Sequence, residues 1–150
     1  MSIRPNPDEF PPDEIVHASC VAIGGQAVLL AGRSGAGKSD LALRLIDRGA
    51  ALVSDDYTEL RRLGDSLLAQ APATIAGRIE VRGIGLVELA EAAAIPVCLY
   101  ADLDSSPQRL PEAATVRLAG VDIPRVALAA LEPSAPLKLE QALVRFGLPL

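Results

Sequence analysis

The residues most able to do chemistry lie in a glycine-rich segment, GRSGAGKS at positions 32–39, which satisfies the phosphate-binding pattern GxxxxGK[ST] in full. Glycines let successive backbone N–H groups turn inward to form a nest for anions, and the helix that follows directs its positive end at the same point. In this pattern the lysine reaches the phosphates and the serine hydroxyl binds Mg²⁺. We therefore expect ATP and Mg²⁺ as cofactors, with the nucleotide bound by Gly32, Ser34, Gly35, Ala36, Gly37, Lys38 and Ser39.

Two adjacent acids, Asp55 and Asp56, end the next apolar stretch of the chain, LVSDD at 52–56. A carboxylate at the end of such a strand typically binds Mg²⁺ in P-loop enzymes. Because alternate strand residues point to opposite sides, one carboxylate can face the metal while the other faces the group being phosphorylated. The structural alternative is an exposed acidic turn.

The only histidine, His17, lies at the start of the apolar run 16–23, which Gly24 and Gly25 join to the run 26–31. A two-residue hairpin turn there pairs the two runs and sets His17 opposite the start of the glycine-rich loop. An imidazole at that point can donate a hydrogen bond to a phosphate oxygen or shift the pKa of a neighbouring acid. A lone histidine at a strand end also commonly has a structural role.

A third group of charged residues occurs at Glu80 and Arg82, two positions apart and therefore on one face of a strand. Gly83 and Gly85 follow and permit a close approach of backbone to a ligand. A cross-strand ion pair is the commoner explanation for such a pair of charges.

Strands and helices that alternate along the chain must position these residues, which indicates an α/β fold. We expect one domain over 15–150 after a flexible, proline-rich leader over 1–14. The last helix is expected to begin at a Ser134 cap. The expected strands are 16–23, 26–31, 50–54, 57–63, 66–70, 79–81, 96–102, 115–118 and 121–123, and the helices are 39–49 and one over 134–147.

Composition excludes several classes of protein. The 150 residues carry 14 basic and 19 acidic side chains, a net charge of −5, which is the wrong sign for a nucleic-acid partner. No apolar run is long enough to predict a signal peptide or a membrane span. Cys20 and Cys98 lie in apolar stretches without metal-ligand spacing, so we expect buried reduced thiols and a cytoplasmic protein.

Taken together, His17, GRSGAGKS at 32–39, VSDD at 53–56 and IEVRGIG at 79–85 resemble the catalytic domain of the HPr kinase/phosphorylase family over roughly residues 15–125. The resemblance implies a P-loop kinase domain with a mixed sheet, similar to phosphoenolpyruvate carboxykinase, with a hairpin preceding the P-loop. It also implies a homohexamer, and from charge and hydropathy we expect no nucleic-acid or membrane partner. The implied activity is ATP-dependent phosphorylation of a serine of HPr or an HPr-like phosphocarrier, with phosphate-dependent dephosphorylation as the reverse reaction.

The resemblance also implies roles for individual residues. Asp55 would be the general acid and base, His17 would lie at the phosphate, and Arg82 would act from the signature loop. Arg125 is the nearest candidate for a charge-stabilising arginine near the carboxyl end. The metal would be held by Ser39, Asp56 and Glu80.

The chain departs from the family pattern in three ways. We expect the catalytic half without the usual amino-terminal domain. Ala18 follows the histidine where the family commonly has glycine, and no Gly-Arg-Asn stretch occurs near the carboxyl end.

Two other functions fit a phosphate-binding loop, namely a small-molecule P-loop kinase and a nucleotide-binding switch without catalysis. The hairpin before the loop and the scarcity of arginine over 84–116, where only Arg109 occurs, disfavour the first. The paired acids disfavour the second, since a binding module needs at most one carboxylate for Mg²⁺.

Overall fold

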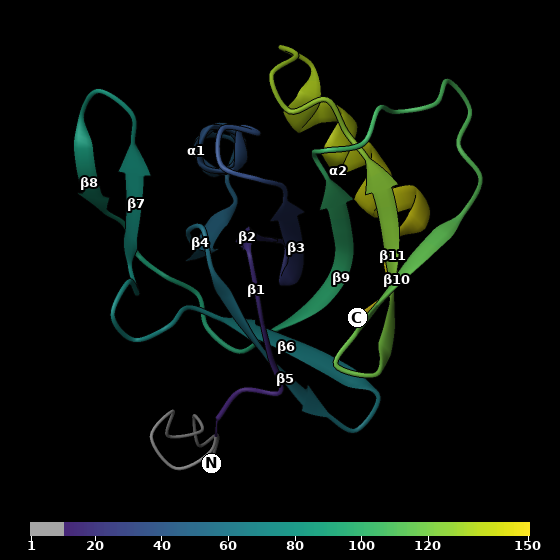
Figure 1. The fold of residues 1–150 in the computed structure, drawn as a ribbon, viewed down its shortest axis with the longest axis horizontal. Helices are drawn as coiled ribbons and strands as arrows, with labels where there is room; N and C mark the ends of the chain where they lie inside the picture. Colours follow the sequence, from purple (N-terminus) through teal and green to yellow (C-terminus); the bar gives the residue numbers. More distant parts are fainter. Residues whose placement is uncertain (1–10) are drawn as a thin grey trace.

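The structure is a computed structural model that describes residues 11–150, arranged as a mixed sheet with helices against it (Figure 1). In the described residues the strands are β1 (Glu14–Val16), β2 (Ala18–Ile23), β3 (Gln26–Ala31), β4 (Ala51–Ser54), β5 (Thr58–Leu63), β6 (Ser66–Gln70), β7 (Arg78–Val81), β8 (Gly85–Glu88), β9 (Ile95–Asp102), β10 (Ala114–Leu118) and β11 (Val121–Ala127). The helices are α1 (Lys38–Asp47) and α2 (Ala135–Phe146).

The main sheet has the order β1-β5-β6-β9-β3-β2-β4, and β11 pairs with β9 and with β10. β3, β9 and β11 run parallel to one another. Because β2 is antiparallel to both β3 and β4, β4 points the same way as β3. The carboxyl ends of four strands therefore meet at one edge, where ligands bind in open α/β sheets.

The hairpin expected before the glycine-rich loop is formed by β2 and β3. Its register pairs Ala18 with Ala31 and Ile23 with Gln26, as the sequence predicted. Gly24 and Gly25 have φ angles of 57° and 81°, which a two-residue hairpin turn requires and which side chains other than glycine rarely tolerate. The turn chemistry thus fixes the register and brings residue 17 beside the start of the loop.

Both faces of the central strands are buried, which explains why β3 is apolar from residue 27 to residue 31. On one face Val28 and Leu30 pack with Leu41 of α1 and Leu139 of α2. On the other face Leu29 packs with a cluster that includes Leu60 of β5 and Leu67 of β6. Leucine, valine and alanine thus fill most of the core.

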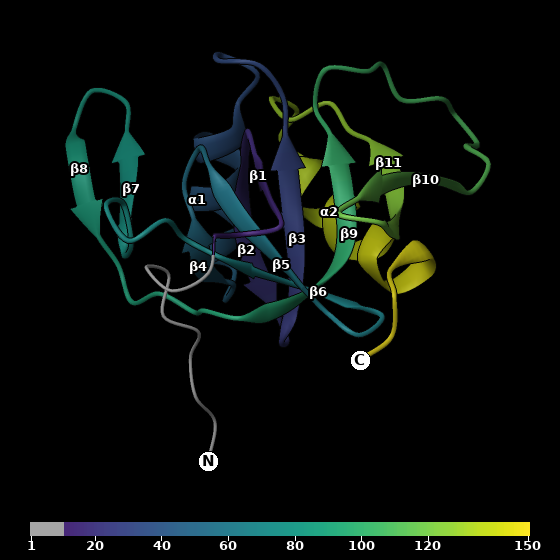
Figure 2. The same cartoon turned by 60° about the horizontal axis from the view of Figure 1, so that its bottom comes forward.

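β7 and β8 form a separate two-stranded hairpin that stands apart from the main sheet (Figures 1 and 2). It is anchored by Ile79, which is fully buried in the cluster with α1. Its tip exposes Ile84 and Leu86. The sequence predicted β7 and the tight turn after it but not β8.

The expected leader, residues 1–14, falls mostly outside the described residues. Within the described part, Asp13 donates its N–H to the Leu60 carbonyl at 3.0 Å and accepts the Arg62 N–H at 2.6 Å. β1 begins at Glu14. The chain is therefore held against β5 from residue 13 onward.

Two further expectations can be compared with the structure. Cys20 and Cys98 are free and buried, as predicted, and burial raises the pKa of both thiols. The Ser134 side chain makes no capping hydrogen bond, so that detail was wrong. Instead its carbonyl accepts the Lys138 N–H at 2.9 Å, and Pro136 fits the first turn because a proline there lacks only an N–H that is unpaired in any helix. In the described part of the chain, neither helix has the length and hydropathy needed to cross a bilayer.

Candidate active site

The glycine-rich loop joins β3 to α1, the context that its pattern requires. Gly35 and Gly37 have φ angles of 86° and 96°, so the loop uses backbone conformations that favour glycine. Gly37 caps α1 without a side-chain hydrogen bond, which leaves the first N–H groups of the helix directed at the loop. This end of α1 can therefore bind an anion.

Lys38 opens α1 and folds its side chain back over the loop. Its Nζ donates to the carbonyls of Gly32, at 2.6 Å, and Arg33, at 3.0 Å. It also lies 3.8 Å from Oδ1 of Asp56, and the side chain is only 5% exposed. A charged amine is thus held between the phosphate-binding loop and an acid.

Asp55 ends β4 as a buried carboxylate with three hydrogen bonds. Its Oδ1 accepts the hydroxyls of Ser39 at 2.5 Å and Ser19 at 3.1 Å. Its Oδ2 accepts the N–H of Glu80 at 2.9 Å. Asp55 therefore ties the loop, the β2 strand and the β7 hairpin together.

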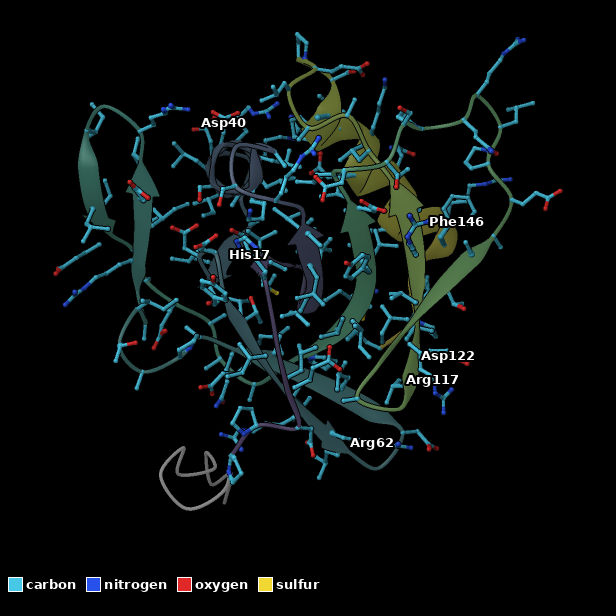
Figure 3. All side chains as sticks on the ribbon, in the orientation of Figure 1. His17, Asp40, Arg62, Arg117, Asp122 and Phe146 are labelled. Carbon is cyan, nitrogen blue, oxygen red and sulfur yellow. The ribbon has the colours of Figure 1, made fainter. Side chains whose placement is uncertain are left out.

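Asp56 differs from its neighbour, since half of its side chain is exposed. Its φ of 65° turns it away from Asp55, and its N–H donates to the Ser19 hydroxyl at 3.0 Å. Its Oδ1 lies 2.8 Å from Nε2 of His17. His17, labelled in Figure 3, lies near the middle of the molecule. Its ring stacks on that of Tyr57, with ring centroids 4.9 Å apart, which fixes the plane of the imidazole.

A pocket of about 380 Å³ adjoins both acids. Glu80 lines it together with Asp55 and Asp56, so these three expected site residues come together. Arg82 does not join them, since it lies exposed in the turn between β7 and β8 and is not part of the pocket wall. Arg78, at the start of β7, supplies the positive charge of this pocket.

The residues of this edge fit a magnesium ion that is shared with a bound phosphate. Mg²⁺ is commonly held by one or two carboxylates plus the phosphate oxygens of the substrate. Ser39 and Asp55 offer two oxygen ligands 2.5 Å apart. Within residues 11–150 no three histidine, cysteine or carboxylate side chains form a metal site by themselves.

Arg125 lies on β11 and does not touch the acids. Its guanidinium bonds the carboxylate of Asp102 and the hydroxyl of Ser105. Burial raises the pKa of Asp102, but hydrogen bonds from Ser105 and the Asp104 N–H together with Arg125 outweigh it and hold the pKa below its usual range. Asp102 pairs with Ala31 across β9 and β3, so this ion pair borders the glycine-rich loop from the side opposite to the acids.

The sequence analysis missed Ser19, which bonds to both Asp55 and Asp56. Its only signal is a hydroxyl inside an apolar strand, and such a serine is usually paired when buried. It also missed Tyr57, whose ring holds His17, and Arg78 in the pocket wall. These contacts depend on the pairing of β2 with β4 and on the position of the β7 hairpin, which no local pattern encodes.

The fold, together with the sheet edge that carries the glycine-rich loop, defines the class of protein. It is a mixed α/β domain with a phosphate-binding loop beside a pair of acids. Residues 8–95 match the family model described as HPr Serine kinase C-terminal domain. The chain belongs to this family, as the resemblance predicted.

Individual relatives agree with this assignment. The HPr kinase/phosphorylase of Chlorobium chlorochromatii is 35% identical over 136 residues, which cover 81% of this chain and 41% of that protein. The HPr kinase/phosphorylase of Exiguobacterium sp. is 45% identical over 82 residues, which cover 54% of this chain and 26% of that protein. The chain thus matches less than half the length of either relative.

A solved structure is similar over most of the chain. It is the HPr(Ser) kinase/phosphatase from Coxiella burnetii, with a TM-score of 0.76 and 29% sequence identity. The match covers 88% of this chain and 94% of that one. The mixed α/β fold is therefore the fold of an HPr kinase/phosphatase.

Proposed function

We propose that this chain is an ATP-dependent protein serine kinase and a phosphate-dependent phosphorylase, and that its substrate is a seryl residue of HPr or an HPr-like phosphocarrier protein. The observation that carries the proposal is the convergence on one oxygen, Oδ1 of Asp56, of Lys38 Nζ at 3.8 Å and His17 Nε2 at 2.8 Å. A base, a phosphate-binding cation and an imidazole thus adjoin one phosphate-binding loop. Family membership supports a protein substrate over a small molecule.

The hydrogen bonds favour a division of labour opposite to the one expected from the sequence. Asp55 is buried and already accepts three hydrogen bonds, one of them from Ser39, the expected metal ligand. Asp56 is half-exposed and can be reached by a seryl hydroxyl from solvent. We therefore assign the metal side to Asp55 and proton transfer to Asp56.

In the forward reaction a carboxylate oxygen of Asp56 accepts the proton of the seryl hydroxyl. The seryl oxygen attacks the γ-phosphorus of ATP, the bond from that phosphorus to the bridging oxygen breaks, and ADP leaves. Lys38 offsets the charge of the phosphates in the loop. His17, in the tautomer that carries a proton on Nε2, donates to Asp56 and orients it.

The same groups serve the reverse reaction by microscopic reversibility. Inorganic phosphate, bound in the nest of the loop, attacks the phosphorus of phosphoserine, and the bond to the seryl oxygen breaks. Asp56 returns its proton to that oxygen, and pyrophosphate is the product. His17 can also donate a hydrogen bond to the attacking phosphate.

Ser39 and Asp55 would hold Mg²⁺ with oxygen atoms of the nucleotide, and Glu80 faces the same pocket. The bound ion would offset phosphate charge. The catalytic role expected of Arg82 stays a prediction. Its exposed position in the turn between β7 and β8 makes it accessible to a protein substrate.

A transfer assay tests the proposed function. Purified protein is incubated with Mg²⁺, labelled ATP and HPr or an HPr-like carrier, with the serine-to-alanine carrier as the control. We expect label on the seryl residue only, and pyrophosphate when phosphorylated carrier is incubated with inorganic phosphate. Transfer to a metabolite with none to any carrier would favour a small-molecule kinase, and nucleotide binding without any transfer would favour a switch.

We also propose, from the family resemblance, a cytoplasmic homohexamer built from one catalytic domain per chain. Light scattering measures the mass directly, and six chains of 15.6 kDa each are expected. A mass of one chain at micromolar concentration would contradict the hexamer without affecting the assignment of the site.

A further inference from the structure

Among the described residues that line the pocket beside the two acids, Arg78 is the one cation, and the reaction steps above do not use it. The same wall carries three carboxylates, those of Asp55, Asp56 and Glu80. Within residues 11–150 the Arg78 guanidinium has no hydrogen bond and no ion pair, and the side chain is exposed. Its charge is therefore available to a ligand.

The β7 hairpin directs Arg78 toward this pocket. Ile79 is fully buried in the core, so its neighbours along the strand, Arg78 and Glu80, point to the opposite face. The Glu80 N–H donates to Oδ2 of Asp55 at 2.9 Å, which fixes the strand against the acids. Glu88 lies opposite Arg78 in the register of β7 and β8, yet in the described part of the chain the two form no ion pair.

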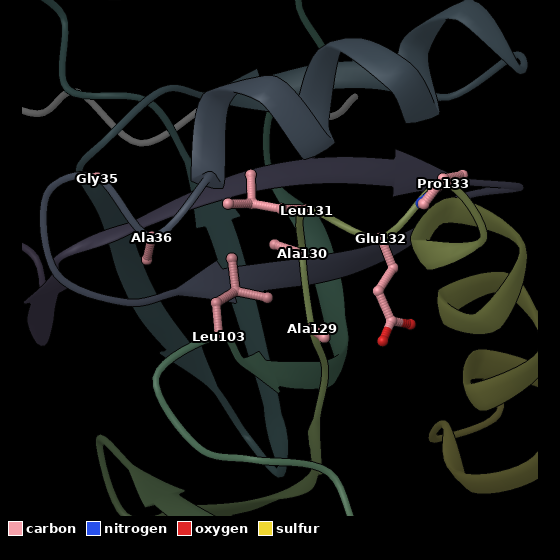
Figure 4. A pocket seen from close by; sticks show the side chains of 8 residues that line it. All are labelled: Gly35, Ala36, Leu103, Ala129, Ala130, Leu131, Glu132 and Pro133. Carbon is pink, nitrogen blue, oxygen red and sulfur yellow. The ribbon is translucent and has the colours of Figure 1, made fainter.

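The other pocket beside the glycine-rich loop offers no such cation among its described residues. It has a volume of about 600 Å³ and is lined by Gly35, Ala36, Leu103 and the segment 129–133 (Figure 4). Its one charged side chain, Glu132, is bonded to Lys138 at 2.7 Å. Of these two pockets, the one with Arg78 is therefore suited to a ligand that brings an anion to the acids.

The two forms of the carrier differ in charge at the residue that enters this pocket. A seryl hydroxyl is neutral, whereas phosphoserine carries a charge of about −1.5 to −2 at pH 7. The three carboxylates repel such an anion. A guanidinium offsets this repulsion, because its planar fork can donate two parallel hydrogen bonds to phosphate oxygens. An arginine in the pocket wall thus favours the phosphorylated form and hardly affects the neutral one.

We infer that Arg78 binds the phosphoryl group of the phosphorylated carrier and thereby determines the specificity of the phosphorylase reaction for phosphoserine. The inference rests on the proposed function, because phosphoserine has to reach the pocket at Asp56. Arg78 forms no covalent bond and transfers no proton. It offsets the charge of the three carboxylates while the phosphoseryl residue is bound.

The test compares the binding of the phosphorylated and the unphosphorylated carrier by titration calorimetry, without Mg²⁺ and inorganic phosphate so that no transfer occurs. The carrier is the one that the transfer assay identifies. Arg78→Met keeps an apolar side chain and removes the charge. We expect the affinity for the phosphorylated carrier to fall about tenfold, the scale for loss of hydrogen bonds to a charged group, and that for the unphosphorylated carrier to stay within about twofold.

Two further variants sharpen this test. Arg117→Met is the matched control, since it removes the same charge from an exposed ion pair on β10 and should change neither affinity. Arg78→Lys keeps the charge but lacks the guanidinium fork, so we expect an intermediate loss of about threefold for the phosphorylated carrier. Circular dichroism melts verify that each variant is folded.

Turnover assays provide a second readout. In Arg78→Met the KM for the phosphorylated carrier should rise about tenfold in the phosphorylase reaction. The KM for the unphosphorylated carrier in the kinase reaction should stay within about twofold, because that substrate brings no phosphoryl group into the pocket.

The possible outcomes separate the two proposals. Equal weakening of both forms of the carrier by Arg78→Met would show that Arg78 contacts the protein part of the carrier, and this result, or no weakening of either form, would overturn the inference. The proposed function itself fails if the wild-type protein transfers label to no carrier. It also fails if Lys38→Ala leaves unchanged the affinity for magnesium-bound inorganic tripolyphosphate, a mimic of the phosphates of ATP.

Discussion

The two sides of the glycine-rich loop differ in the kind of side chain that faces them. On the side of β4 and β7 the pocket holds Asp55, Asp56, Arg78 and Glu80. On the side of β9 and β11 the larger pocket holds Leu103 and four apolar or small residues of 129–133. Of the charged residues that line the two pockets, all except Glu132 thus lie on the side of the acids.

This difference indicates which measured properties a substitution on each side would change. On the acid side, hydrogen bonds from β2, α1 and β7 meet at Asp55, so that a change of one charge alters either proton transfer or the metal site. On the apolar side shape is held by backbone contacts to Arg44, and a substitution there alters ligand affinity alone. Substitutions on each side should therefore separate chemistry from binding.

The largest effect is expected at Lys38, the first residue of α1, whose Nζ lies against the glycine-rich loop and 3.8 Å from Oδ1 of Asp56. Lys38→Ala removes a cation that would contact the phosphates, and we expect transfer to fall about 10³- to 10⁵-fold, the scale for losing a cationic group that stabilises phosphoryl transfer. The measurement is kcat/KM for the carrier together with the affinity for tripolyphosphate. Arg117→Ala is the control, because Arg117 pairs with Asp122 at 3.0 Å on the far part of the sheet (Figure 3).

The next prediction sharpens the comparison within the acid side. Asp56→Asn should lower transfer about 10²- to 10⁴-fold, the range for loss of a general base, with ATP affinity nearly unchanged. Asp55→Asn should weaken Mg²⁺-dependent ATP binding, because the carboxylate that faces Ser39 loses its charge. It should also destabilise the fold, since an amide in place of Oδ2 would direct a donor at the Glu80 N–H.

Calorimetry with and without Mg²⁺ and single-turnover transfer measure these two effects separately. If instead Asp55→Asn binds MgATP normally and fails only in transfer, the division of labour expected from the sequence is right and ours is wrong.

Much of this arrangement was predictable from the sequence because it is local. The glycine-rich loop, the strand before it and the helix after it are consecutive, and Gly24 and Gly25 set the register that brings His17 to the loop. The pairing of β2 with β4 is not local, so the bonds of Ser19 to both acids were missed.

The apolar pocket was not predictable for the same reason. In the sequence, residues 129–133 look like an ordinary apolar loop between a strand and a helix. They line a pocket only because β9 and β11 run parallel to β3. A hydrogen-bonding motif has a chemical signature in sequence, whereas an apolar surface acquires a role only through its neighbours.

The smallest expected effect concerns the stability of the side of the loop formed by β9 and β11. It tests how much the charged carboxylate of Asp102, at the end of β9, contributes to the free energy of unfolding. Asp102 accepts from Ser105 Oγ at 2.7 Å and from the Asp104 N–H at 2.9 Å, and it pairs with Arg125. These contacts hold its pKa below the ordinary value despite partial burial. Since the pKa is lower in the folded than in the unfolded chain, the stabilisation is present above the unfolded pKa of about 3.9 and is lost as pH falls through the folded pKa.

We therefore expect the free energy of unfolding to fall on acidification below about pH 4, and Asp102→Asn to flatten that part of the profile. At neutral pH the substitution should cost about 1.5 kcal/mol, the lower end for hydrogen bonds to a charged group, because an asparagine oxygen in place of Oδ1 can still accept the N–H groups of Asp104 and Ser105. Urea unfolding across this pH range measures both effects. Asp122→Asn, at an exposed ion pair, should cost less than about 0.5 kcal/mol.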